Sequence, residues 1–294
     1  MLTFNGNIMK FNNKWGRPYT PPPPYDPLNP LNLPARTIRV RFAAGTDVNA
    51  YSNETIYINA TKTLVDAENN IWDITYPEYE IIQTLSSALQ PAEYHDYQLL
   101  EVLGANTHGI TDMHWMFCGC RAITYLPIFD TSAVTNMSLF ASTCDSLVTV
   151  PLYDTSSATN LNAMFAGCSS IESVPLYDTS SATTMERMFY LCTSLKSLQQ
   201  FNMSNVTNMD SMCLHCSSLE SIPQLSIPKV TDMDYAFKNC YKVSSGALAL
   251  YQQASTKSIS VTSHSQTFTD CGRDTTAGAA ELAQIPSSWG GNGA

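Results

Sequence analysis

This 294-residue sequence is poor in charge, since Asp, Glu, Lys and Arg make up only 14% of its residues. A typical globular domain has about a quarter. The charges that are present sum to −10, which argues against a nucleic-acid-binding protein held by phosphate contacts. No apolar run of about 18 residues or more occurs, so the sequence predicts no membrane span.

Targeting signals are also lacking at the N-terminus. The first residues, Met1 to Asn7, contain no charged segment followed by an apolar core, so no secretory signal peptide is predicted. No cysteine of the kind that carries a bacterial lipid anchor lies near this end.

Motifs for catalysis are missing as well. The five histidines form no Ser/His/Asp pattern on a common element, and no paired carboxylates or glycine-rich phosphate loop accompany them. They are His95, His108, His114, His215 and His264. The sequence therefore predicts a protein that is not an enzyme and that needs no cofactor and no metal.

What the sequence does contain is an internal repeat with a period of 24 residues. Equivalent positions hold one residue type, or closely related types, in successive units. The cysteine column is Cys120, Cys144, Cys168, Cys192, Cys216 and Cys240, and the threonine column is Thr111, Thr135, Thr159, Thr183, Thr207 and Thr231. A period of 24 lies within the range of about 20–29 residues found in leucine-rich repeats.

Each unit reads as one short helix followed by one short strand. Thr135 suits a helix N-cap, and Thr183 with Glu186 has the spacing of a capping box. The helix would bury the positions from Met137 to Cys144 that recur at helical spacing. The strand would follow from Leu147 to Leu152. The predicted fold class is therefore α/β: a leucine-rich-repeat solenoid of six 24-residue repeats, with a parallel sheet on one side and short helices on the other.

The repeat resembles the BspA-type, DUF285-like leucine-rich repeat, with the pattern DTSxVTNMxxMFxxCxxL. The segment from Phe129 to Met137 carries this pattern, and the units that begin at Asp154 and Asp178 match it closely. Departures occur where Phe140-Ala141 replaces the Met-Phe pair, where Cys213 replaces Phe, and where Gln199-Gln200 replaces Pro-Leu. The resemblance covers about half of the chain.

The resemblance implies a non-enzymatic, adhesive role, because this class occurs in surface proteins of gut and oral bacteria. Such proteins are usually secreted or lipid-anchored, and neither signal is seen here. We therefore expect a bacteriophage virion appendage, a tail or head fibre-like protein exposed outside the cell after synthesis in the host cytoplasm. The alternatives are a bacterial cell-surface adhesin of the BspA type and a purely structural virion decoration protein. A homo-oligomer is a further possibility.

Four segments are predicted along the chain. Residues 1–35 form an arm, residues 36–98 a small α+β capping domain, residues 99–247 the solenoid and residues 248–294 a C-terminal cap. The capping domain should contain strands at Thr37–Ala43, Ile56–Ile58 and Ile71–Tyr76 and a helix near Ile81–Leu89. Two helices, at Gly246–Ser255 and Ala277–Gln284, should cover the last coil, because an uncovered terminal repeat exposes its core.

The arm differs from the rest of the chain in charge and composition. Residues 1–41 hold six Lys or Arg and one Asp, a net charge of +5, so the remainder carries −15. Half of the 16 prolines also lie there, which favours an extended chain. It is either a linker or an anchor that docks onto proteins of a larger assembly. Aromatic interface residues favour the anchor: Phe4, Phe11, Trp15, Tyr19 and Tyr25.

The cysteine column is predicted to be a buried ladder of free thiols. Stacked coils lie about 4.8 Å apart, and side chains that run parallel at that spacing do not point at each other as a disulfide requires. The pairs Cys213/Cys216 and Cys118/Cys120, with His215 and His114 nearby, resemble metal ligands. Their positions in core columns favour a structural role.

The candidate ligand-binding residues are a column predicted to face outward from the sheet. By period two, the position after the last inward strand residue points to solvent, and exposed aromatics there would suit a host-surface glycan or protein. The column is Phe129, Tyr153, Tyr177, Phe201 and Leu225. The alternative is that these rings stack on one another as structural filler. Beside them runs a possible cation ladder of Asp130, Asp154, Asp178 and Asn202, for which Asx turns are the favoured explanation.

Overall fold

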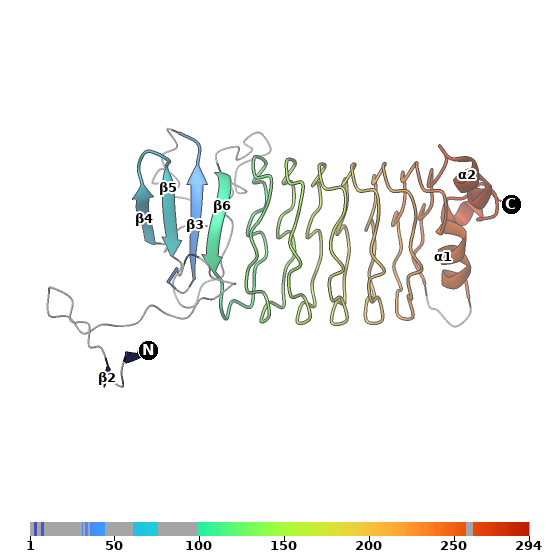
Figure 1. Ribbon diagram of the computed structural model, residues 1–294. Helices are drawn as coiled ribbons and strands as arrows, with labels where there is room; N and C mark the ends of the chain where they lie inside the picture. Colours follow the sequence, from blue (N-terminus) through green and yellow to red (C-terminus); the bar gives the residue numbers. More distant parts are fainter. Residues whose placement is uncertain are drawn as a thin grey trace.

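The computed structural model describes residues 3–4, 7–8, 31, 33–34, 36–44, 61–75, 99–256 and 261–293. From one end to the other it contains an antiparallel sheet, a row of stacked coils and a small helical end (Figure 1). None of the helices in these residues combines the length and apolarity that a membrane crossing requires.

The N-terminal part is a four-stranded antiparallel sheet with the strand order β4-β5-β3-β6. Its strands are β3 (Thr37–Phe42), β4 (Thr61–Asp66), β5 (Ile71–Thr75) and β6 (Leu99–Asn106). A separate two-stranded pair joins β1 (Thr3–Phe4) to β2 (Asn7–Ile8).

The alternation of residue types explains why β3 lies inside this sheet. Ile38, Val40 and Phe42 are buried and belong to the same core cluster as the first coils. On the opposite face Arg39 pairs with Asp73 at 2.7 Å, and Arg41 pairs with Glu101 of β6. The sheet therefore has one apolar face, which contributes to the common core, and one face with charged pairs, and its β6 edge lies nearest the coils (Figure 1).

The predictions for this region are partly confirmed. The strands expected at Thr37–Ala43 and Ile71–Tyr76 are present as β3 and β5. The strand at Ile56–Ile58 and the helix near Ile81–Leu89 lie outside the described residues. Strands β4 and β6 were not predicted, and β6 belongs to the sheet although residue 99 was expected to open the repeats.

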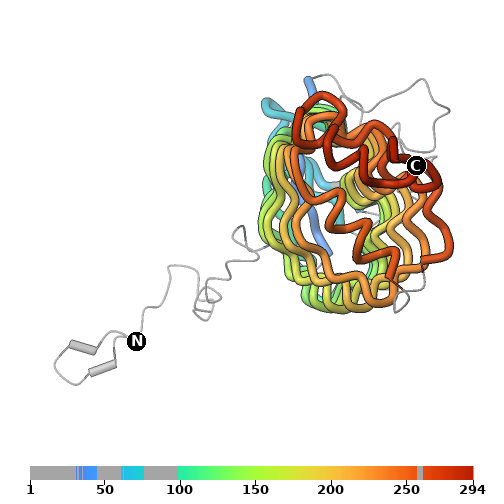
Figure 2. Tube along the Cα trace, turned by 90° about the vertical axis from the view of Figure 1, so that its right-hand side faces the viewer, coloured from blue at the N-terminus to red at the C-terminus, as the bar shows by residue number. Residues whose placement is uncertain are grey.

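The repeats form a stack in which each 24-residue unit makes one coil. We call residues 107–130 coil 1, 131–154 coil 2, 155–178 coil 3, 179–202 coil 4, 203–226 coil 5 and 227–245 coil 6. Backbone hydrogen bonds between neighbouring coils recur in successive units, for example from Met113 N to Asn136 O at 2.9 Å and from Met137 N to Asn160 O at 3.0 Å. Viewed along the stack, the coils follow nearly the same outline (Figure 2).

The predicted fold class is wrong, because the structure is not a parallel-sheet solenoid with a helix in every unit. In the described residues the extended sheet is the antiparallel one of four strands, and the two α-helices both lie near the C-terminus. Between coils the parallel pairing is reduced to isolated bridges such as Asp112↔Asn136 and Asn136↔Asn160. Turns replace the helices, so Thr135 and Thr183 cap no helix.

Backbone geometry explains why the expected helices do not form. In coil 2, Leu139 and Thr143 have φ values of 56° and 58°, in the left-handed region. The same two positions are left-handed in every coil, as Arg187 and Leu191 are in coil 4. A left-handed residue every four positions interrupts a right-handed helix, so the apolar spacing of three and four residues is met by successive turns.

The C-terminal end has the two predicted helices, α1 (Ala247–Ala254) and α2 (Thr276–Leu282), followed by the short 3-10 helix η2 (Ser287–Trp289). Leu250, Leu282 and Trp289 are buried in the same core cluster as the coils. Figure 1 shows these helices at the far end of the stack from the sheet.

The structure also reveals a seventh set of turns, which the 24-residue period did not detect. Thr262, Phe268 and Cys271 stand 31 residues after their equivalents in coil 6, and Met233 N donates to Ser263 O at 2.8 Å. Phe268 stacks on Phe237 with ring centroids 6.3 Å apart. Residues 247–260, which include α1, are therefore inserted between coil 6 and this last set of turns.

Candidate binding surface

Burial along the face opposite the turns repeats every third residue. In coil 2, Leu147, Val150 and Tyr153 are buried, whereas Val148, Thr149 and Leu152 are exposed. A regular strand would alternate every second residue. Pro151 lacks the N–H that a strand ladder uses, so the chain here is not held in a pleated strand.

The aromatic column predicted to face outward is buried, and that prediction is wrong. Each member of the column, Phe129, Tyr153, Tyr177, Phe201 and Leu225, is 2% exposed. Phe129 and Tyr153 stack with centroids 5.7 Å apart, and the Tyr153 hydroxyl donates to Pro127 O at 3.1 Å. The alternative of stacked structural filler describes these side chains correctly.

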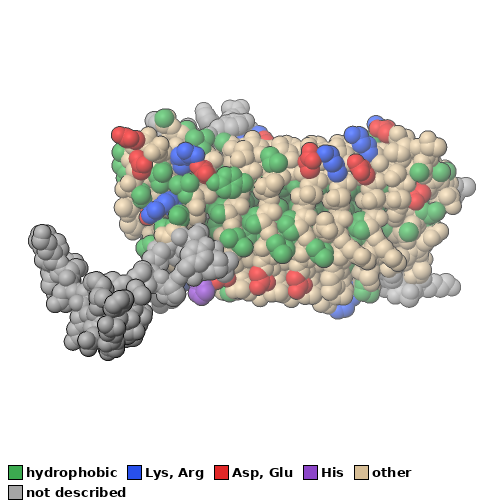
Figure 3. Space-filling view, viewed as in Figure 1, with side chains coloured by type: hydrophobic (Ala, Val, Ile, Leu, Met, Phe, Trp, Pro, Cys, Tyr) green, Lys and Arg blue, Asp and Glu red, His purple; other side chains and the backbone are tan. Residues whose placement is uncertain are grey.

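The exposed side chains are those one position earlier in the chain. Ile128, Leu152 and Leu176 are 43%, 59% and 57% exposed, in coils 1, 2 and 3. Val148 and Tyr125 add to the same surface. Figure 3 shows hydrophobic side chains gathered over the middle of this face. We call these five residues the apolar strip.

The strip ends abruptly, because Gln200 and Gln224 occupy the same column in coils 4 and 5. The sequence changes from Pro-Leu to Gln-Gln at this point. Three adjacent coils with aliphatic residues at a solvent-exposed column amount to a contiguous patch, which on a soluble protein marks an interaction surface.

Charge differs between the two edges of the strip. Along one edge the charges are paired, since Arg121 contacts Asp145 at 2.8 Å and Lys196 contacts Glu172 at 2.7 Å. Beside the column of Leu152 run Asp130, Asp154 and Asp178, two positions further along the chain in each coil. Figure 3 shows a row of acidic side chains along one edge of the coils. This edge is negative and favours a partner with basic side chains.

The acidic row is explained by Asx turns, as favoured from the sequence. Asp154 Oδ1 accepts from the Ser156 backbone N–H at 3.1 Å and from its hydroxyl at 2.6 Å. The equivalent turn follows Asn202, whose Oδ1 accepts from Ser204 N at 3.1 Å. Hydrogen bonds from Ser180 lower the pKa of Asp178. The Asp154 and Asp178 side chains are exposed to solvent, whereas Asp130 is buried.

The cysteine column is buried and free, which confirms the predicted ladder of thiols. Each thiol from coil 2 onward also donates to a carbonyl of the preceding coil, as Cys168 Sγ does to Ala141 O at 3.0 Å and Cys192 Sγ does to Phe165 O at 3.1 Å. Burial raises the pKa of the Cys144 and Cys192 thiols well above the ordinary value. These sulfurs therefore stay protonated, whereas a nucleophile or metal ligand needs a thiolate.

The pairs that resemble metal ligands are accounted for by packing. Cys213 and Cys216 are both fully buried, and Cys216 donates to Phe189 O at 3.0 Å, while His215 contacts Asn239 Nδ2 at 3.2 Å. Cys118 and Cys120 are likewise free. Within the described part of the chain, no three His, Cys, Asp or Glu side chains come together as a metal site would need.

The histidines are dispersed. His108 contacts Asp130 at 2.5 Å, His114 contacts Asp112 at 2.8 Å, and His264 stacks on Trp289 with centroids 4.0 Å apart. His95 lies outside the described residues. His108 contacts the Asp130 carboxylate, His215 the Asn239 amide and His264 the Ser288 backbone oxygen, and none of these groups is a hydroxyl or thiol nucleophile.

Most of the proposed anchoring arm lies outside the described residues. Phe11, Trp15, Tyr19 and Tyr25 lie outside the described residues, and of Phe4 only the backbone in β1 is described. The first side chain that is placed is Leu31, and Asn106 Nδ2 donates to Leu33 O at 2.9 Å. Leu31 and Leu33 thus lie beside β6.

The sequence matches the family model described as "Mycoplasma protein of unknown function, DUF285" over residues 83–172 and again over residues 138–251. The two ranges together run from residue 83 to residue 251, more than half of the 294-residue chain. They include every coil of the stack. No curated protein matches the chain.

Among solved structures, this chain is similar to a leucine-rich repeat protein from Bacteroides ovatus ATCC 8483. The sequence identity is 15% and the TM-score is 0.30. The similarity covers 63% of this chain and 44% of that chain, so this chain spans less than half the length of the other protein.

Proposed function

Since this chain belongs to the family described as "Mycoplasma protein of unknown function, DUF285", we propose that it is a BspA-like surface protein that binds a protein partner through the apolar strip. The observation that carries the proposal is the exposure of Ile128, Leu152 and Leu176 on three adjacent coils. Nothing in the packing of the described residues requires aliphatic side chains there, because Gln200 and Gln224 fill the same column without loss of the stack.

The partner should carry basic groups beside an apolar patch. Asp154 and Asp178 are exposed along one edge of the strip, and a partner with Lys or Arg at that edge would associate faster and with a dependence on salt. The apolar side chains would supply affinity, because burying aliphatic surface contributes about 25 cal/mol per Å².

The proposal is non-catalytic, as expected from the sequence. Burial and raised pKa values make the thiols poor nucleophiles, and the described histidines lie apart from one another. These observations support binding rather than chemistry as the role of the coils.

The location proposed is the bacterial cell surface. The family description names Mycoplasma proteins, and it gives no support to the expected bacteriophage virion appendage. Residues 1–41 carry a charge of +5, whereas the remainder carries −15. This difference favours residues 1–35 as the segment that attaches the chain to the cell surface.

The binding role is tested by replacing leucines of the strip with glutamine, the residue that occupies the same column in coils 4 and 5. A fluorescently labelled chain is incubated with cultured epithelial cells, and bound fluorescence is measured by flow cytometry. The double variant Leu152→Gln with Leu176→Gln should bind roughly thirtyfold less, because two aliphatic contacts of about 1 kcal/mol each would be lost. Its melting temperature should be unchanged, because coils 4 and 5 already carry Gln in this column.

The matched control is Leu191→Gln, which removes an exposed leucine outside the strip and should leave binding intact. Protease treatment of the cells should abolish binding if the partner is a protein. Equal binding by the wild-type chain and the double variant, or binding that survives protease treatment, would contradict the proposal.

A further inference from the structure

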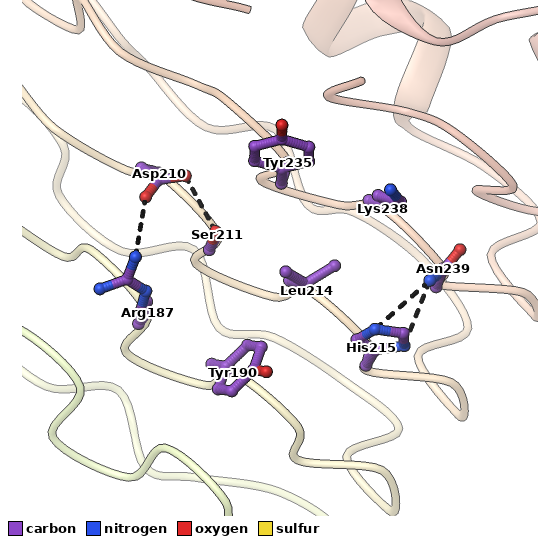
Figure 4. Close-up of a pocket in the computed structure, with 9 residues that line it drawn as sticks. All are labelled: Arg187, Tyr190, Asp210, Ser211, Leu214, His215, Tyr235, Lys238 and Asn239. Atoms are coloured by element: carbon purple, nitrogen blue, oxygen red, sulfur yellow. Dashed lines mark hydrogen bonds and ion pairs between the residues drawn. The ribbon is translucent and has the colours of Figure 1, made fainter. Parts of the chain in front are cut away.

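A concave surface lies on coils 4, 5 and 6, away from the apolar strip. It encloses about 380 Å³, near the lower end of the range of about 300–1,000 Å³ for small-molecule sites. It is open to solvent, and Figure 4 shows the side chains that line it.

The cavity arises because one column holds a small residue between two large ones. Arg187, Ser211 and Tyr235 occupy equivalent positions in coils 4, 5 and 6. All three have left-handed backbones, with φ values of 54°, 55° and 56°, so their side chains leave the coils in corresponding directions. The short Ser211 side chain therefore leaves a gap between the guanidinium and the ring.

The middle of the cavity is apolar and its two sides are aromatic. Figure 4 places Leu214 between Tyr190 and Tyr235, which come from coils 4 and 6. The Tyr235 hydroxyl points away from the leucine (Figure 4). A ligand with one apolar face could lie on this surface with the rings beside it.

Polar groups occupy both ends of the cavity. At one end Asp210 accepts from Ser211 Oγ at 2.8 Å and lies 3.7 Å from Arg187 Nη2. At the other end Asn239 Nδ2 contacts His215 at 3.2 Å, with Lys238 beside them (Figure 4). Each end thus offers donors and acceptors together, because a carboxylate, an amide oxygen and N–H groups are all present.

Charge within the cavity is nearly balanced, which disfavours a strongly anionic ligand. Arg187 is already engaged by Glu186 at 2.8 Å as well as by Asp210. Lys238 contacts Gln266 at 2.5 Å and lies over the Tyr235 ring at 5.2 Å from its centroid. The cations therefore have partners without a ligand.

We propose that this cavity binds a neutral saccharide of one or two rings. A pyranose has apolar C–H faces and an edge of hydroxyls that both donate and accept, which matches a tyrosine-flanked leucine with mixed polar groups at both ends. A purely apolar ligand would cover Asp210 and Asn239 without using their remaining hydrogen-bonding capacity, at a cost in affinity.

The saccharide site is independent of the protein-binding strip. It uses coils 4 to 6, whereas the strip uses coils 1 to 3, and it lies on different columns of the repeat. An open cavity of this size gives weak affinity for a single sugar, so display of many copies of the chain would be needed for adhesion.

The test uses the full-length chain and saturation-transfer difference NMR with a panel of neutral sugars: glucose, galactose, mannose, N-acetylglucosamine, lactose and cellobiose. At millimolar concentration at least one should show transfer from the protein. Tyr190→Ala and Tyr235→Ala should each weaken binding about fivefold or more, and Ser211→Tyr should abolish it by filling the gap. The columns tolerate these residues elsewhere, as Ala166, Ala163 and Tyr235 show.

Trp115→Ala is the matched control, because Trp115 occupies the Tyr235 column in coil 1, and it should not change sugar binding. Melting curves of each variant establish that it is folded, and if Ser211→Tyr does not fold, the two alanine variants decide. Absence of transfer to every neutral sugar, or binding that folded Tyr190→Ala and Tyr235→Ala retain in full, would overturn the proposal. The strip variants leave this assay unaffected, so the two proposals can fail separately.

Discussion

The left-handed residues set the geometry of each coil. Two positions per unit, four residues apart, have φ between 51° and 81° in the coils and in the last set of turns. Glycine occupies one of them in Gly119 and Gly167, while Thr143, Leu191 and His215 occupy the equivalent places. A side chain with a Cβ in this region costs about 1–2 kcal/mol relative to the right-handed conformation.

Leu191 is poorly suited to this conformation, and its replacement should stabilise the protein. Leu191→Asn should raise the free energy of unfolding by roughly 0.5–1 kcal/mol, because asparagine tolerates the left-handed region better and Asn239 already occupies this column. Urea titration followed by circular dichroism measures the change. Leu176→Asn, at an exposed position without a positive φ, should leave the stability unaltered, and an equal gain there would refute the explanation.

The thiol ladder makes the stability depend on pH. Buried Cys144, Cys168, Cys192, Cys240 and Cys271 have pKa values raised above the ordinary 9.0, with burial as the largest cause. Above pH 9.0 the unfolded chain loses thiol protons that the folded chain retains, so the unfolded state is favoured. The stabilisation is fully present below this pH and is lost as the pH rises.

Alkaline unfolding is therefore expected. Each buried thiol should lower the free energy of unfolding by about 1.4 kcal/mol per pH unit above its ordinary pKa. Urea midpoints measured under reducing conditions between pH 7 and pH 11 should fall steeply above about pH 9. Cys168→Ala should start from a lower stability at neutral pH and show a shallower fall. A stability that is level across this range would mean that the thiols ionise in the folded protein.

At the scale of the element, the sequence predicted which residues share a column but not how the chain runs between them. The 24-residue phase placed Cys144, Leu147 and Val150 correctly in the core. It failed at Tyr153 because the assumed strand alternates every second residue, whereas the chain around Pro151 buries every third. Burial periods of two and three residues cannot be told apart over a stretch this short. The positive φ values that produce turns instead of a helix cannot be recognised from the sequence either, because residue types such as Leu139 and Thr143 do not signal them.

The two candidate sites differ in how far they could be predicted from the sequence. The face that bears the apolar strip was predicted, but the column was displaced by one residue. The saccharide cavity was not foreseen, because it depends on the side-by-side arrangement of Arg187, Ser211 and Tyr235. Comparing residue sizes down each column would have marked the gap at Ser211. The last set of turns was missed because an insertion changes the spacing from 24 to 31 residues.

At the scale of the whole molecule, each coil contacts its neighbours through equivalent bonds. Thr159 Oγ1 donates to Thr135 O at 3.2 Å, Thr183 Oγ1 to Thr159 O at 3.0 Å, and Thr207 Oγ1 to Thr183 O at 3.1 Å. Such an array has a stability close to the sum of its coils and their interfaces. Removal of a complete coil should therefore leave a protein that still folds, whereas removal of part of a coil should not.

Deleting residues 155–178 should leave a folded protein with lower stability, because Asp154 then precedes Thr179 just as it precedes Thr155 now. Deleting only residues 155–166 removes fewer residues but shifts every following column by half a unit, so this variant should fail to fold. Thermal unfolding followed by circular dichroism compares the two. A half-coil deletion as stable as the full-coil deletion would mean that the columns are not in register.

The direction of the hydrogen bonds between coils determines how the protein would respond to a mechanical force. The backbone bonds from Met113 to Asn136 and from Met137 to Asn160 point along the stack, from one coil to the next. A force applied between the sheet and the C-terminal helices acts on them lengthwise, and the interfaces carry it one after another in series. The weakest interface opens first and releases a coil of slack chain while the others stay closed. A surface protein built in this way would unfold one coil at a time under flow. The coils that stay folded would still be able to bind their ligands.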